Sequence, residues 1–293
     1  MNQKASSIGN LAADILAKGG SGEVARVFQR SIYIRVRQDF ILLLWGGLRS
    51  PMTINLEGKS VADRRIKVED LAFLDRDVIR LRELEIDLRG AEVFRSALLG
   101  VREVTLPRGS VLAKGVAMLR AFYDVSPAGP TLASDPALKT FVRETLVPFA
   151  HGSSGALFSP TSYLPLIGRG GGFTPAGDDL IGGIVSTYNY VARCRRTRQV
   201  LIPRVLIRSR TVPESAIILT HSARGNVDEG MEQLILASTG GVRFYDELVA
   251  VARRGHTSGI DASLGVMLCE AALAQIGGES GALEKCLDAF WNT

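Results

Sequence analysis

The sequence predicts an α+β protein, with a β-rich N-terminal barrel or sandwich domain followed by an all-helical C-terminal domain. Up to about residue 106, apolar and polar residues alternate with period two between Gly, Pro and Asp punctuation, which is typical of half-buried strands. After Pro107, apolar residues recur at helical spacing instead. A chain of 293 residues is also long enough for two domains. We place these domains at residues 1–106 and 107–293.

The composition is that of a globular protein, with 46% hydrophobic and 22% charged residues. The longest apolar runs, such as Phe40 to Trp45, are far too short to span a membrane. Residues 1–18 contain Asp14 and no cleavable apolar core, so no signal peptide is expected. The three cysteines are odd in number and lack the spacing of a metal site. We therefore expect a cytoplasmic protein with no membrane association.

The N-terminal domain begins with a predicted short helix over residues 7–18, which ends at Gly19-Gly20. Several stretches of alternating apolar and polar residues follow it. They lie within residues 22–36, 52–56, 79–81 and 84–88, with the dense apolar run at 40–45 between them. This pattern predicts antiparallel strands with one face exposed to water. The domain contains no His or Cys and no catalytic cluster, so we expect a scaffold or a docking surface.

The C-terminal domain shows helical periodicity throughout. The predicted helices cover residues 109–123, 136–149, 175–193, 213–223, 226–237, 246–254, about 260–275 and 281–291. Ser134 is the predicted cap of the second helix, and Asn226 with Glu229 is a predicted capping box. Between the second and third helices, residues 152–172 are rich in Gly, Ser and Pro and show no period. A long irregular loop in a compact domain is more often functional than idle.

This loop leads into a glycine-rich motif that runs from Gly168 to Asp179 and opens the third helix. Thr174 is a suitable N-cap, and the following proline suits the first helical position. The amides of Gly170, Gly171 and Gly172 are free to turn toward one point, and a helix N-terminus adds positive partial charge. Arg169 supplies donors for phosphate or carboxylate. The loop is therefore either an anion site or a structural turn, and it matches neither a Walker loop nor a dinucleotide fingerprint.

Two adjacent carboxylates, Asp178 and Asp179, follow Gly177 in the first turn of the same helix. They fit either of two roles: complementing the helix dipole, or holding a metal ion or a substrate amide. Gly182 and Gly183 weaken the helix, and we expect them to admit another backbone at close range.

A second polar motif, His256-Thr257-Ser258-Gly259-Ile260-Asp261, opens the apolar helix that ends near Gln275. Aligning Gly177 with Gly259 superposes Asp179 on Asp261 and Gly183 on Gly265, which indicates a faint internal repeat or a chance similarity. Two such N-termini facing each other would build a polar pocket for a small anionic ligand. His256 is either a donor at that pocket or a loop cap. The three histidines lack metal-ligand spacing, so no zinc site is expected.

Seven arginines and no acidic residue lie between Arg193 and Arg210. A basic run of this kind is a possible nucleic-acid surface, but no aromatic residue is interleaved with the arginines and no binding motif accompanies them. We therefore interpret the run as a solvated face and expect no nucleic-acid partner.

Taken together, these motifs resemble the AllH-type family, a subunit of oxamate carbamoyltransferase in allantoin degradation. The Gly168–Asp179 stretch is similar to the family's glycine-rich signature, and Gly255–Gly259 is similar to its G-H-[TS]-S-G motif. Arg210-Thr211 and the Val24–Trp45 region also fit. The run from Val200 to Ile207 departs from the family by being unusually apolar and basic, and Pro213-Glu214-Ser215 departs from its Thr-Thr-x-x-Ser pattern.

The resemblance implies carbamoyl transfer from carbamoyl phosphate to an amide or amine such as oxamate, without a cofactor and together with partner subunits. Arg169, Gly170–Gly172, Thr174, Gly177 and Gly259 would bind the phosphate or carboxylate. His256, Thr257 and Ser258 would donate to the carbonyl oxygen, and Asp178, Asp179 and Asp261 would orient the nitrogen or hold the loops. Two other hypotheses remain: a non-catalytic interaction subunit, and magnesium-dependent phosphotransfer at Asp178 and Asp179.

Overall fold

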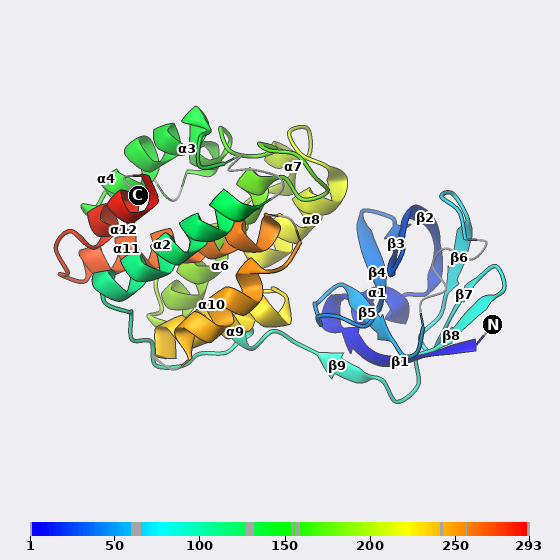
Figure 1. Cartoon of the computed structure of the whole chain (residues 1–293). Helices are drawn as coiled ribbons and strands as arrows, with labels where there is room; N and C mark the ends of the chain where they lie inside the picture. Colours follow the sequence, from blue (N-terminus) through cyan, green and yellow to red (C-terminus); the bar gives the residue numbers. More distant parts are fainter. Residues whose placement is uncertain are drawn as a thin grey trace. The chain divides into compact units, whose positions relative to one another are not determined.

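The chain forms two compact units in a computed structural model that describes residues 2–59, 66–126, 132–153, 155, 157, 159–240, 243–255 and 257–291 (Figure 1). The first, here called the barrel unit, comprises Met1–Ala97 and Asn226–Glu229. The second, the helical unit, comprises Leu98–Gly225 and Gly230–Thr293. The predicted boundary lies at residue 106, and the return of residues 226–229 to the N-terminal unit was not predicted.

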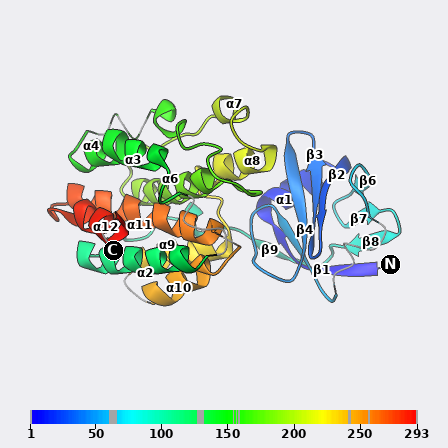
Figure 2. The ribbon, with the colours of Figure 1, turned by 45° about the horizontal axis from the view of Figure 1, so that its top comes forward.

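The barrel unit confirms the predicted α+β class and selects a barrel over a sandwich. Its strands are β1 (Asn2–Gly9), β2 (Gly20–Phe28), β3 (Ser31–Val36), β4 (Asp39–Trp45), β5 (Thr53–Leu56), β6 (Leu71–Leu74), β7 (Val78–Leu81), β8 (Leu84–Asp87) and β9 (Glu92–Phe94). The sheet runs in the order β5-β4-β3-β2-β6-β7-β8-β1, and pairing of β1 with β5 closes it. Strand β9 adds to β1 outside this ring (Figures 1 and 2).

Two details of the N-terminal prediction are wrong. The helix predicted from residue 7 begins only at Asn10, as α1 (Asn10–Ala17), because residues 7–9 belong to β1. The strands are not all antiparallel, since β1 runs parallel to β8 and β9, and β4 runs parallel to β5. β1 is polar and shows no clear alternation of apolar and polar residues. Its pairing with three other strands uses backbone hydrogen bonds, so the side-chain pattern did not predict this strand.

The barrel is filled by the apolar residues of the alternating strands. The fully buried ones include Val24, Ile32, Ile34, Ile41, Leu43, Ile54, Ile79, Leu81 and Ile86. Burial of this kind supplies most of the free energy that holds such a sheet closed, about 1.5–3 kcal/mol for each large aliphatic side chain.

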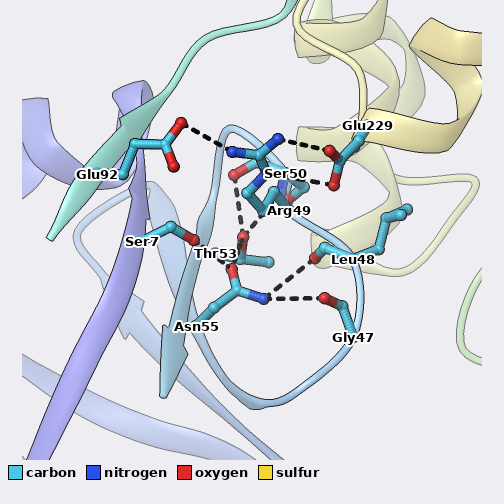
Figure 3. A network of polar contacts seen from close by, with 9 residues as sticks. All are labelled: Ser7, Gly47, Leu48, Arg49, Ser50, Thr53, Asn55, Glu92 and Glu229. Carbon is cyan, nitrogen blue, oxygen red and sulfur yellow. Dashed lines mark hydrogen bonds and ion pairs between the residues drawn. The ribbon is translucent and has the colours of Figure 1, made fainter. Parts of the chain in front are cut away.

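A polar network at one edge of the barrel holds residues 226–229 in this unit (Figure 3). The Arg49 guanidinium lies between two carboxylates, 2.9 Å from Glu92 and 2.5 Å from Glu229. Below it, Asn55 accepts hydrogen bonds from Ser7 and Thr53 and donates to the carbonyls that precede Arg49. The predicted capping box at Asn226 is therefore wrong: α9 (Glu229–Gly240) begins three residues later, and the Glu229 side chain binds Arg49 instead.

The helical unit follows the predicted sequence of helices. It contains α2 (Gly109–Val125), α3 (Pro136–Phe141), α4 (Val147–Ala150), α6 (Ala176–Cys194), α7 (Arg204–Ile207), α8 (Pro213–Ser222), α9, α10 (Phe244–Ala252), α11 (Ser258–Ile276) and α12 (Ala282–Trp291). The helix predicted over 136–149 is divided by a π-helical turn, Val142–Leu146, that precedes Pro148. Its cap is Asp135, which accepts from the Ala137 amide, and not the predicted Ser134.

Helix α11 is long and apolar enough to cross a membrane by length and composition alone. However, 83% of its apolar window is buried inside the protein, as in the core helix of a globular domain. It is also the helix that packs most closely against α6.

Candidate functional site

Helices α6 and α11 pack side by side through the glycines that the sequence alignment superposes (Figure 2). A Cβ atom on Gly183 would lie 2.1 Å from the Ala262 carbonyl oxygen, and one on Gly265 would lie 2.1 Å from that of Leu180. Each helix thus presents its glycine to the backbone of the other at the corresponding position. The two motifs are therefore similar in their packing as well as in their sequence.

This crossing brings the two predicted motifs together at the N-termini of the helices. The Thr174 and Ser258 hydroxyl oxygens are 2.9 Å apart, across 84 positions of chain. Thr174 is not the N-cap that the sequence predicts, because α6 begins one residue later with Pro175 as its cap. Its hydroxyl lies against Ser258 at the start of α11, and both hydroxyl side chains also hydrogen-bond the Asp179 carboxyl group.

Two carboxyl groups lie where the helices meet, and each has a buried Oδ2 atom with no hydrogen-bond partner among the described residues. Asp261 is fully buried, and its Oδ1 accepts from the Tyr123 hydroxyl. Burial raises the pKa of Asp261 to about 7, against the hydrogen bonds from Tyr123 and Thr257. Burial also raises the pKa of Asp179 well above its ordinary value, and the charge of Asp261 acts in the same direction.

This arrangement suits a ligand that carries N–H groups. Asp179 is partly exposed as a residue, whereas its Oδ2 atom and the whole of Asp261 are buried. An unpartnered acceptor in a buried place costs free energy until a donor reaches it. An amide nitrogen offers such donors, and a carboxyl that holds its proton near neutrality can donate in return.

Tyr123 is the member of this group that sequence reasoning missed. It lies on α2 in the buried stripe of Leu112, Val116 and Leu119, so periodicity predicts that it faces the core. Its partner Asp261 is 138 positions away, and nothing in the local sequence identifies that contact.

The carboxylate of Asp178, next to Asp179, is engaged in hydrogen bonds within the protein. It accepts from the Gly168 amide at 2.7 Å, from the Ser215 hydroxyl at 2.6 Å and from the Thr211 hydroxyl. Gly168 has φ +77°, and a Cβ atom there would lie 1.8 Å from the Arg210 carbonyl oxygen. Asp178 therefore holds the glycine-rich loop against residues 210–215, which is one of the two roles that the family resemblance implies for it.

Replacing Asp178 by alanine should lower the free energy of unfolding by about 3 kcal/mol, because three donors lose their acceptor. Denaturant unfolding of the full chain measures this. Asp246→Ala is the matched control: its side chain is exposed and lies 3.7 Å from Arg243, so a change within about 0.5 kcal/mol is expected. Equal stability of the two variants would show that the Asp178 contacts do not secure the loop.

The glycine-rich loop leaves several backbone amides without a partner within the described residues. Gly170 and Gly172 have φ +90° and +101°, which favour glycine. The amides of Gly170, Gly171 and Gly172 donate to no atom of the described residues, and all three residues are exposed. Arg169 is also exposed, with its Nε 3.3 Å from the Pro165 carbonyl oxygen.

Two of the predicted anion contacts have a different role in the structure. The Gly177 amide donates to the Arg169 carbonyl, and the Gly259 amide donates to that of Arg254. A Cβ atom on either glycine would lie 1.9 Å from a carbonyl oxygen. Both are needed for close packing, and their amides are engaged.

The remaining predicted residues are placed as follows. Thr257 precedes α11, and its carbonyl accepts from the Asp261 amide at 2.9 Å. His256 lies outside the described residues. Within the part of the chain that the structure describes, no group of three or more His, Cys, Asp or Glu side chains could hold a metal ion.

The family described as oxamate carbamoyltransferase subunit AllH matches residues 166–270, a segment that includes both glycine motifs. No curated protein and no solved structure matches the chain. The match confirms the resemblance predicted from the motifs: residues 166–270 are similar to the AllH family, whose description is that of a subunit of oxamate carbamoyltransferase.

Proposed function

We propose that this chain is a carbamoyltransferase subunit that binds an anionic, amide-bearing substrate where α6 and α11 begin. The observation that carries the proposal is the meeting of the two motifs, with Thr174 and Ser258 2.9 Å apart and two unpartnered carboxyl oxygens beside them. A helix N-terminus with free amides favours an anion, and the carboxyl pair favours an amide.

Carbamoyl phosphate and oxamate both have this shape, a planar amide next to an anionic group. In the proposed reaction, the acceptor nitrogen attacks the carbamoyl carbon, the bond from that carbon to the phosphate oxygen breaks, and inorganic phosphate leaves with the proton from nitrogen. The protein has to bring the two substrates together and stabilise the charge that develops on the carbonyl oxygen.

The residues divide by the group that they would contact. Arg169, the Gly170–Gly172 amides and Thr174 would bind the phosphate or carboxylate. His256, Thr257 and Ser258 would donate to the carbonyl oxygen, and Asp179 and Asp261 would orient the amide nitrogen. Asp178 would not contact the substrate, but it holds the glycine-rich loop in place by accepting from the Gly168 amide.

Arg169→Ala should weaken binding of carbamoyl phosphate by about 10- to 100-fold, because a charge-assisted contact to an anion is lost. Titration calorimetry on the full chain measures this, with inorganic phosphate as a second probe. Arg143→Ala is the control, since Arg143 is similarly exposed and pairs with Glu144 at 2.8 Å. Unchanged affinity in Arg169→Ala would remove Arg169 from the site.

The same titration separates the alternatives. Binding without magnesium supports carbamoyl transfer, whereas binding that requires magnesium supports phosphotransfer at Asp178 and Asp179. The three hydrogen bonds that Asp178 already accepts weigh against the latter. Absence of binding to the full chain, alone and with its partner subunits, would leave a non-catalytic interaction subunit.

A further inference from the structure

The segment that follows α6 combines unusual charge with exposed apolar side chains. Seven arginines and no acidic residue lie between positions 193 and 210. Within the same segment Leu201 and Val205 are 66% and 64% exposed, and Leu206 is also exposed. Single exposed apolar residues are ordinary, but three within six positions, surrounded by like charges, form a patch.

This patch is held firmly by the protein. Val200, Ile202 and Ile207 are buried, so the segment is anchored by one set of apolar residues and presents another. The buried Asn189 side chain binds both the amide and the carbonyl of Val200, at 2.7 and 2.8 Å. The exposed side chains are therefore carried by an ordered backbone, which lowers the entropy lost when a partner binds.

Arginines around the patch are available for an external partner. Arg193 is occupied, since its guanidinium donates to the carbonyls of Leu98 and Arg224. In contrast, Arg195, Arg196, Arg208 and Arg210 are exposed and form no ion pair with any described residue. Charges of this kind steer association with an acidic surface.

The segment also ends at the candidate site. The Arg210 carbonyl is the group against which Gly168 packs, and Thr211 donates to Asp178. A protein docked on residues 195–210 would therefore sit beside the glycine-rich loop. Helix α7 lies next to α8 in the helical unit (Figures 1 and 2).

We propose that residues 195–210, here called the basic face, dock a partner subunit of the carbamoyltransferase complex that presents apolar side chains within an acidic rim. The inference rests on the proposed function insofar as the partner is a subunit of that complex. A protein fits better than a nucleic acid, because the segment has no aromatic residue for base stacking and its centre is apolar.

The test uses the full chain and the purified partner subunits encoded in the same genome, with binding followed by analytical ultracentrifugation and surface plasmon resonance. The double variant Leu201→Asp/Val205→Asp should raise the Kd for the partner by at least about tenfold, since two apolar contacts become buried charges. The triple variant Arg195→Glu/Arg196→Glu/Arg208→Glu should slow association and remove its dependence on salt. Either variant remains informative if the other fails to fold.

Val125→Asp is the matched control, because Val125 is 78% exposed on the same unit but lies outside the basic face. Partner affinity equal to that of the wild-type chain in both folded face variants would overturn the proposal. So would tighter binding of the wild-type chain to single-stranded DNA or to phosphatidylserine vesicles than to the partner subunits, lost in the arginine variant. Phosphate binding measured on the same samples reports on the proposed function separately, since the face variants leave Arg169 and Gly170–Gly172 intact.

Discussion

Gly183→Ala is expected to lower the free energy of unfolding by about 3 kcal/mol or more, the upper range for overpacking a buried contact. The new Cβ atom would lie 2.1 Å from the Ala262 carbonyl oxygen, so α6 and α11 would have to separate. The same separation would displace Asp179 from Asp261, and ligand binding should fall with stability. Denaturant unfolding and calorimetric titration of the full chain measure the two effects.

The neighbouring residue provides the control. At Gly182 the nearest atom to a new Cβ would be the end of the Leu219 side chain, 3.9 Å away. Gly182→Ala should therefore raise the free energy of unfolding by up to about 1 kcal/mol, because alanine favours the helix over glycine. If both alanine variants changed stability alike, the reciprocal glycine crossing of α6 and α11 would not exist in solution.

Asp261→Asn is expected to stabilise the protein above neutral pH while it abolishes binding of the amide-bearing ligand. The pKa of Asp261 is about 7 in the folded protein and near its ordinary value of 3.8 when unfolded. The unfolded chain therefore loses this proton first as the pH rises, and stability falls between about pH 4 and pH 7. Above pH 7 the buried carboxylate lowers the free energy of unfolding by on the order of 4 kcal/mol. Asparagine does not ionise, so Asp261→Asn avoids this loss.

Glu270→Gln separates stability from binding. Glu270 is also fully buried on α11, with a pKa raised by burial to about 8, and its partner is Ser238 rather than the candidate site. Its substitution should likewise flatten the fall of stability with pH, over about pH 4.5 to 8, but should leave carbamoyl phosphate binding unchanged. Denaturant midpoints at several pH values measure this. An Asp261→Asn variant with the wild-type pH profile of stability and the wild-type affinity would contradict both the raised pKa of Asp261 and its role in binding.

Much of the helical unit was predictable because its signals are local. The period of apolar residues placed α6 and α11 within a few residues of their observed ends. Glycine also acted as a local signal with a tertiary meaning: close approach of another backbone was predicted at Gly182 and Gly183, and it occurs at Gly183 but not at Gly182. The elements that failed were those whose side chains turn to distant partners, such as Thr174 toward Ser258 and Glu229 toward Arg49.

By itself, the sequence determined the two-part α+β organisation, the helices of the second part and the two glycine motifs, since periodicity and turn chemistry act over a few residues. Only the tertiary structure decided that β1 closes a barrel, that Asp178 holds a loop while Asp179 meets Asp261, and that Tyr123 donates to that carboxyl. These pairings join residues far apart in the chain. Their energies depend on burial and on the distance between groups, and neither quantity exists until the chain has folded.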